Sequence, residues 1–202
     1  MGAGRKAKGE RRKRGKKVLL PSRGSRALRP SPFAGRPIRA LFFDVDGVLT
    51  DGRIYLAGDG TEFKVFDTKD GHGTRKAIAA GLKVAWISGR TSRATSARAR
   101  DLGVHACIQG QHEKRTAYER LCRRWKLDPS ETAAMGDDEP DLPMLEAAGF
   151  SACPADATPA ARKAAQVVLK RAGGRGAARE FIEMVLARNN RRKANGVRRK
   201  AP

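Results

Sequence analysis

A regular alternation of short apolar runs with longer helix-like stretches constrains the fold of this chain more than any other feature. Continuous hydrophobicity, rather than hydrophobicity at every second position, is typical of strands whose two faces are both covered. The runs are Ile38–Asp44, Leu82–Ser88, Val104–Ile108, Thr132–Gly136 and Gln166–Leu169. Stretches rich in Ala, Arg, Leu and Glu separate them, at 73–80, 92–102, 112–126 and 140–148. This order predicts an α/β fold with a doubly wound parallel sheet.

One segment departs from the alternation directly after the first run. The stretches Arg53–Ala57 and Thr61–Asp67 flank Gly58-Asp59-Gly60, which is a typical turn sequence. We therefore expect a β-hairpin that protrudes as a flap between the first strand and the first helix.

The formal net charge of +22 over 202 residues lies mostly at the two ends. Residues 1–36 carry 13 Lys or Arg and one acidic residue, residues 188–202 carry seven and none, and residues 37–187 are close to neutral at +3. The sequence thus predicts a basic disordered extension at 1–36, one folded domain at 37–187 and a basic disordered tail at 188–202. Such ends could bind nucleic acid, and the Arg-rich N-terminus also has some features of a mitochondrial address.

The cysteines and the hydropathy pattern favour a cytoplasmic protein. Cys107, Cys122 and Cys153 form no close pair, which fits a reducing compartment and argues against a disulfide framework. No apolar run approaches about 20 residues, the length of a membrane-spanning helix.

Polar side chains follow four of the predicted elements. Asp44 and Asp46 end the first strand, Ser88 and Gly89 end the second, Lys114 begins a helix after the third, and Asp137, Asp138 and Asp141 follow the fourth. The carboxyl ends of parallel strands lie at one edge of a sheet, where ligands bind. Taken singly, the first pair could be a turn or a calcium loop, Ser88 a helix cap, and the acidic cluster a solvated loop.

Together these four elements resemble the haloacid-dehalogenase superfamily of phosphatases over residues 38–187. The resemblance implies that Asp44 is a nucleophile forming an aspartyl-phosphate and that Asp46 is the general acid and base. It also implies Mg²⁺ held by Asp44, by the backbone carbonyl of Asp46 and by Asp137, with support from Asp138 or Asp141. Ser88, Gly89 and Lys114 would hold the phosphoryl group.

The short spacings between these motifs leave no room for a cap domain. The chain resembles the capless phosphatases that act on 3-deoxy-D-manno-octulosonate (Kdo) 8-phosphate in bacteria. Besides the motifs above, this resemblance rests on Gln109-Gly110-Gln111 and Gly173-Gly174-Arg175-Gly176-Ala177. This resemblance implies a homotetramer in which Arg175 helps to close the pocket. It also implies a substrate-binding set of Asp46, Asp67, Thr68, Lys69, Asp70, Gly71, Arg75, Arg90, Arg98, Lys114 and Asp138.

Two other functions remain open on sequence alone. One is a phosphatase for a nine-carbon 2-keto sugar acid 9-phosphate, although relatives of that type tend to carry acidic residues where Arg90 and Arg175 stand here. The other is nucleic-acid binding through the basic ends, which lack the aromatic residues that stack on bases.

Overall fold

The computed structural model describes the backbone of residues 1–2 and 36–198, and side chains as far as Arg192. The predicted basic extension therefore lies almost wholly outside the described residues. Strands β1 (Ala40–Phe43), β4 (Lys83–Ile87), β5 (Ala106–Ile108), β6 (Thr132–Met135), β7 (Phe150–Cys153) and β8 (Val167–Val168) form one sheet, in the order β5-β4-β1-β6-β7-β8. Each adjacent pair is parallel. The predicted doubly wound parallel sheet is confirmed.

Strand β7 was not expected from the sequence. Its four residues, Phe-Ser-Ala-Cys, are all buried, but they include a serine and two small side chains, so they do not stand out as an apolar run. Neighbouring strands and not β-propensity fix this segment in the sheet, since it pairs with β6 on one side and β8 on the other.

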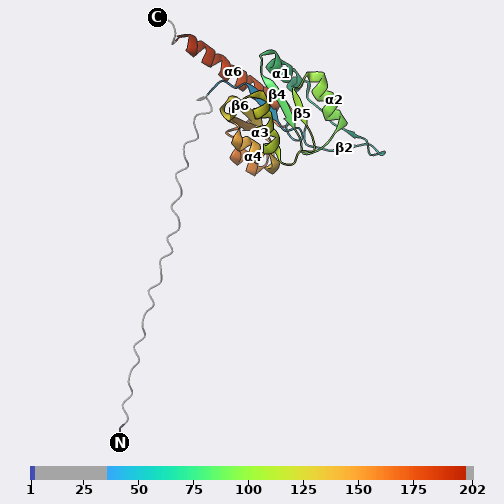
Figure 1. Ribbon diagram of the computed structural model, residues 1–202. Coiled ribbons are helices and arrows are strands. Elements are labelled where there is room, and N and C mark those ends of the chain that lie inside the picture. The colour runs from blue at the N-terminus through green and yellow to red at the C-terminus, as the bar shows by residue number, and fades with distance from the viewer. Residues whose placement is uncertain (3–35, 199–202) are drawn as a thin grey trace.

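Helices cover both faces of the sheet, as Figure 1 shows. Helices α1 (Thr68–Ala79), α2 (Arg93–Leu102) and α6 (Ala177–Arg198) share one apolar core with one face of the sheet. Helices α3 (Lys114–Trp125) and α4 (Leu142–Ala147) share a second core with the other face, and α5 (Pro159–Ala164) packs in a smaller cluster. Short 3₁₀ turns at Pro129–Glu131 and Glu139–Asp141 precede β6 and α4.

Strand β1 shows why the apolar runs are continuous. Phe42 packs against Tyr118 of α3, with ring centroids 4.8 Å apart, and the next residue, Phe43, packs against Phe181 of α6 at 6.1 Å. Successive side chains of a strand point to opposite faces, so a central strand between two helical layers needs an apolar residue at every position.

The predicted hairpin is present as β2 (Tyr55–Leu56) and β3 (Glu62–Phe63), which pair antiparallel. In Figure 1 it extends away from the sheet beyond α2. Only this hairpin and α1 lie between β1 and β4, so no cap domain is inserted there.

The predicted boundary at residue 188 is wrong. Helix α6 continues to Arg198, and Arg188 is buried, with its guanidinium 5.5 Å from the centre of the Phe150 ring. Asn189 exchanges two hydrogen bonds with the backbone of Ile38, at 2.9 and 2.8 Å. The basic composition suggested a solvated tail, but the side chains of Arg188 and Asn189 pack against the body of the domain. Among the described helices, none is both long and apolar enough to cross a membrane.

Candidate active site

The loop after β1 places the two carboxylates predicted there. Asp44 is buried, and its N–H donates to Met135 O of β6 at 3.0 Å, so its backbone continues the sheet. The chain then turns through Gly47, whose φ of +92° favours glycine. A Cβ on Gly47 would lie 2.1 Å from Asp137 Oδ2. This close approach brings the β1 loop against the β6 loop.

Lys114 joins the two loops electrostatically. From the start of α3, its Nζ lies 2.5 Å from Asp44 Oδ1 and 2.6 Å from Asp141 Oδ1, and its side chain is only 6% exposed. Burial alone would lower the pKa of this ammonium group, but the charges of Asp44 and Asp141 raise its pKa above the ordinary lysine value. Lys114 therefore stays cationic.

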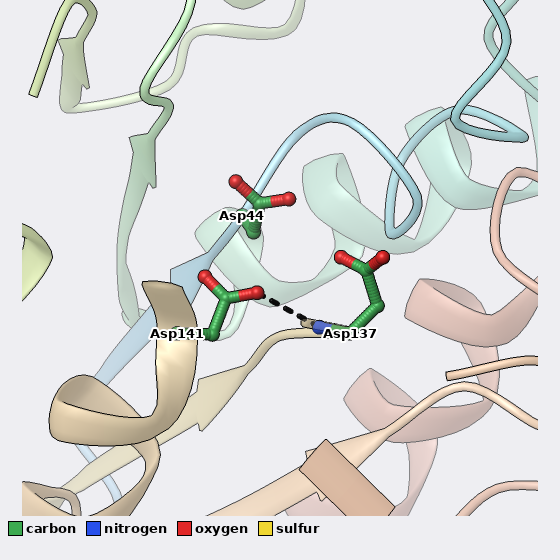
Figure 2. A group of neighbouring side chains, drawn as sticks. All are labelled: Asp44, Asp137 and Asp141. Carbon is green, nitrogen blue, oxygen red and sulfur yellow. Dashed lines mark hydrogen bonds between the residues drawn. The ribbon is translucent and has the colours of Figure 1, made fainter. Parts of the chain in front are cut away.

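The loop after β6 supplies the remaining carboxylates. Asp141 Oδ2 accepts hydrogen bonds from the N–H groups of Asp137 and Asp138, at 2.9 and 3.2 Å. Gly136 permits this because a Cβ there would lie 2.3 Å from Asp141 Cβ. Figure 2 shows the carboxylates of Asp44, Asp137 and Asp141 directed toward a common region.

These three carboxylates form a site that could hold a metal ion. One oxygen from each lies within 4.8 Å of the others, and Asp137 Oδ1 is buried without a hydrogen-bond partner. Burial and repulsion by Asp141 raise the pKa of Asp137 to about 7, and the same two causes raise the pKa of Asp44 well above its usual value. A divalent cation would relieve this repulsion, and an all-oxygen ligand set suits Mg²⁺.

The side chain of Asp46 does not belong to this carboxylate group. Its Oδ1 accepts from Lys64 Nζ, and its Oδ2 accepts from Ser88 Oγ at 3.4 Å. A metal role for Asp46 therefore concerns its backbone carbonyl. Of the two predicted supporting residues, Asp141 is the one that joins Asp44 and Asp137 in the carboxylate group.

A cavity of about 350 Å³ opens at this edge of the sheet. It is large enough for a sugar phosphate, because small-molecule sites begin near 300 Å³. The predicted residues that line it are Asp44, Asp46, Ser88, Gly89, Arg90, Lys114, Asp137 and Asp138. His112 and Asp141 also line the cavity.

Glu62 and Lys64 were missed by the sequence analysis. Glu62 begins β3 and Lys64 directly follows it. Both reach the site: Lys64 contacts Asp46, and Glu62 accepts from Arg90 Nη2. The signal that could have found them is the alternation of charged and apolar residues from Glu62 to Val65.

The other predicted substrate residues lie elsewhere. Arg75 and Arg98 both bind Asp101 of α2, at 3.0 and 2.7 Å. Asp70 is buried and accepts from the N–H groups of Gly176 and Arg179, at 3.2 and 2.7 Å, so it caps the start of α6. Burial raises the pKa of Asp70 to about 6. The first turn of α1 holds the rest of this set: Asp67, which caps the helix, Thr68, Lys69 and Gly71.

The Gly173–Gly176 run packs against the β1 loop. A Cβ on Gly173 would lie 1.8 Å from Gly47 O, and Gly174 N–H donates to Val48 O at 3.0 Å. The glycines at 173 and 174 thus allow close packing of this run against the β1 loop. Arg175 is exposed. The pKa of Asp51 is lowered by a hydrogen bond from the Tyr55 hydroxyl and, to a smaller extent, by the positive charge of Arg175.

Comparisons with known proteins agree with this geometry. The family model described as haloacid dehalogenase-like hydrolase matches residues 107–181. The 3-deoxy-D-manno-octulosonate 8-phosphate phosphatase KdsC of Escherichia coli K12 is 41% identical over 149 residues, covering 74% of this chain and 79% of that protein.

Two solved structures are also similar. The Moraxella catarrhalis 3-deoxy-D-manno-octulosonate 8-phosphate phosphatase, solved with a magnesium ion, a phosphate ion and KDO, has a TM-score of 0.75 and 35% identity, covering 81% of this chain and 94% of that one. The cobalt-bound phosphatase YrbI of Haemophilus influenzae has a TM-score of 0.73 and 38% identity, covering 76% and 90%.

Proposed function

This chain belongs to the KdsC family of haloacid dehalogenase-like phosphatases, and from that premise we propose that it hydrolyses Kdo 8-phosphate to Kdo and inorganic phosphate with the help of Mg²⁺. One observation carries the proposal: Lys114 bridges Asp44 and Asp141 beside the unpartnered oxygen of Asp137. This arrangement supplies a nucleophile, a fixed cation and oxygen ligands at one cavity.

In the first half-reaction, a carboxylate oxygen of Asp44 attacks phosphorus and the bond from phosphorus to the sugar oxygen breaks. Asp46 gives its proton to the departing alkoxide, which would otherwise be a poor leaving group. The product of this step is an aspartyl-phosphate on Asp44. Lys114 offsets the repulsion between the carboxylate and the phosphate dianion.

In the second half-reaction, water attacks the phosphorus atom of the aspartyl-phosphate. Asp46, now ionised, accepts the proton of that water, and the carboxylate of Asp44 is released with inorganic phosphate. Ser88 and the N–H groups near Gly89 lie at the end of β4, where they can bind phosphoryl oxygens.

Mg²⁺ would be held by Asp44 and Asp137, with Asp141 beside them and the Asp46 carbonyl as a further ligand. When bound, it supplies charge that stabilises the transferring phosphoryl group. The raised pKa values of Asp44 and Asp137 support the fit of Mg²⁺ to this site, since they show that the positive charge around these carboxylates does not balance their burial and mutual repulsion.

Arg90 is the residue we assign to the substrate carboxylate. It lines the cavity, and a guanidinium group binds a carboxylate through two parallel hydrogen bonds. Arg75 and Arg98 lie with Asp101, away from this cavity, and so would act on the pocket of a neighbouring subunit. The similarity to bacterial Kdo 8-phosphate phosphatases supports our further proposal of a homotetramer that works in the bacterial cytoplasm.

The test is a panel of phosphorylated sugar acids with Mg²⁺, together with the variant Arg90→Ala. We expect Kdo 8-phosphate to be the best substrate. Arg90→Ala should reduce turnover of Kdo 8-phosphate by at least about tenfold more than that of p-nitrophenyl phosphate, which has no carboxylate. Equal losses on the two substrates would contradict the assignment of Arg90, and preference for a nine-carbon acid would contradict the proposed substrate.

A further inference from the structure

The segment 62–65, which begins with β3, directs charged side chains toward the site and apolar ones toward solvent. Phe63 and Val65 are 50% and 57% exposed, whereas the side chain of Lys64 is only 4% exposed. Side chains alternate along an extended chain, so this is one inward and one outward face. Lysine is rarely buried, because its ammonium group loses hydration. A lysine buried under a protruding hairpin therefore needs an acidic partner.

That partner is Asp46. Lys64 Nζ donates to Asp46 Oδ1, and Ser88 Oγ donates to Asp46 Oδ2 at 3.4 Å. Each oxygen of this carboxylate thus has a donor from a different element, with the hairpin on one side and the end of β4 on the other. These two contacts restrict the rotation of the carboxyl group. In the acid form Lys64 still holds Oδ1, and the transferable proton is on Oδ2, where Ser88 Oγ can accept it as a hydrogen bond and donate its own proton to a phosphoryl oxygen.

Glu62 connects Lys64 to the cavity rim. Glu62 Oε1 lies 3.6 Å from Lys64 Nζ, and Arg90 Nη2 donates to Glu62 Oε2. The hydrogen bond from Arg90 lowers the pKa of Glu62, so Glu62 remains ionised. Charges therefore alternate from Arg90 through Glu62 and Lys64 to Asp46, and each neighbour holds the next in place.

No other cation of the described residues is recorded in contact with Asp46. Lys114 is engaged by Asp44 and Asp141, and Arg90 is engaged by Glu62. Without Lys64, Asp46 would keep only the longer bond from Ser88 and would lie near other carboxylates of the same cavity. Repulsion from them would then favour rotation of Asp46 away from the reacting oxygen.

We propose that Lys64 is a positioning residue that fixes Asp46 for proton transfer, so that the hairpin forms part of the catalytic apparatus. This inference rests on the proposed function, because that function assigns proton transfer to Asp46. Lys64 acts through Asp46 and not on the substrate, so its loss should affect the chemical step more than binding.

The test compares Lys64→Met with Lys83→Met, an exposed lysine at the start of β4. We expect Lys64→Met to lower kcat for Kdo 8-phosphate about 10- to 100-fold, as supporting residues often do. KM should stay within about threefold of the wild-type value. In a single turnover, release of p-nitrophenol should be slowed much less than release of Kdo, because p-nitrophenolate departs as a stable anion without a proton. Steady-state turnover does not separate the two substrates in this way, because water attack on the aspartyl-phosphate uses Asp46 with both. Lys64→Arg should restore part of the lost kcat, and Lys83→Met should resemble the wild type.

Equal slowing of leaving-group release from both substrates in a single turnover would overturn the inference, as would an unchanged kcat or an effect on KM alone. If Lys64→Met unfolds at a clearly lower temperature than the wild type, Lys64→Gln replaces it, because Gln keeps a polar end group. The same comparison between Kdo 8-phosphate and p-nitrophenyl phosphate is then made with that variant. A wild-type enzyme without activity on Kdo 8-phosphate contradicts the proposed substrate only. In that case the slowing of leaving-group release caused by Lys64→Met in a single turnover of another alkyl phosphate is compared with the slowing on p-nitrophenyl phosphate, and this comparison decides the role of Lys64.

Discussion

At the scale of single residues, the site contains more carboxylates than cations. Asp44, Asp137 and Asp141 come together around one ammonium group, that of Lys114. Groups with such raised pKa values cluster at functional sites, because folding alone gains nothing from gathering like charges. This excess of negative charge is stabilised when a bound cation adds positive charge to the site.

The proposed nucleophile, Asp44, is the first residue to test. Asp44→Asn should lower turnover more than about 1000-fold, a barrier increase of about 4 kcal/mol, because an amide cannot attack phosphorus as a carboxylate does. The measurement is kcat for Kdo 8-phosphate in Mg²⁺, with circular dichroism to show that the fold is kept. Asp59→Asn, at the exposed hairpin turn, is the matched control. Turnover within tenfold of the wild type would refute the aspartyl-phosphate mechanism.

At the scale of elements, glycines let three loops meet under the site. Gly173 touches the Gly47 carbonyl, and Gly47 in turn leaves space for Asp137. Gly173→Ala should therefore push the β1 loop away, destabilise the fold by about 1–3 kcal/mol and lower activity. Gly58→Ala is the control, because a Cβ there meets nothing within 4 Å. Thermal unfolding and kcat of the two variants check this, and equal behaviour would show that the contact is not needed.

Helix α6 provides a second test at this scale, because Asp70 caps it. The pKa of Asp70 is raised from its ordinary value of 3.8 to about 6 in the folded protein. Between these two pH values the folded state therefore binds the proton of Asp70 more tightly than the unfolded state does. Stability from this group is thus present at low pH and lost as pH rises toward 6. Asn cannot titrate, so the stability of the wild type relative to Asp70→Asn should fall by up to about 3 kcal/mol from pH 4 to pH 7.

Urea unfolding at a fixed protein concentration measures this difference. Asp59→Asn again serves as an exposed control, which should follow the wild type across the same range of pH. Parallel pH profiles for the wild type and Asp70→Asn would show that Asp70 is not held as an ionisable cap.

The same elements show how far the sequence could predict the structure. Asp44, Ser88 and Asp137 could be placed together because parallel strands share one carboxyl edge. Strand β7 could not be found, because tertiary pairing rather than apolar content defines it. The position of Asp70 could not be predicted either, since its N–H donors lie at and just before the start of α6, more than 100 residues later. Lys64 was overlooked because a lysine in a hairpin usually faces solvent.

At the scale of the whole molecule, the proposed substrate residues form two groups. Arg90 lines the cavity of Asp44, whereas Arg75 and Arg98 lie on α1 and α2 with Asp101. A single subunit would leave the second group without a role in its own pocket. The hairpin also exposes Ile54, Leu56, Phe63 and Val65, each at least half exposed. An apolar surface of this kind on a two-stranded hairpin favours contact with other subunits.

The last prediction is that this chain is a homotetramer assembled through its hairpins. Sedimentation equilibrium at micromolar concentration should give about four times the chain mass of 21.9 kDa. Phe63→Asp places a charge on the exposed face of β3 and should dissociate the assembly, whereas Val168→Asp, at an exposed apolar residue of β8, should not. The dissociated variant should lose activity on Kdo 8-phosphate more than on p-nitrophenyl phosphate, because Arg75 and Arg98 would no longer reach a neighbouring pocket. A fully active monomer would refute the shared pocket.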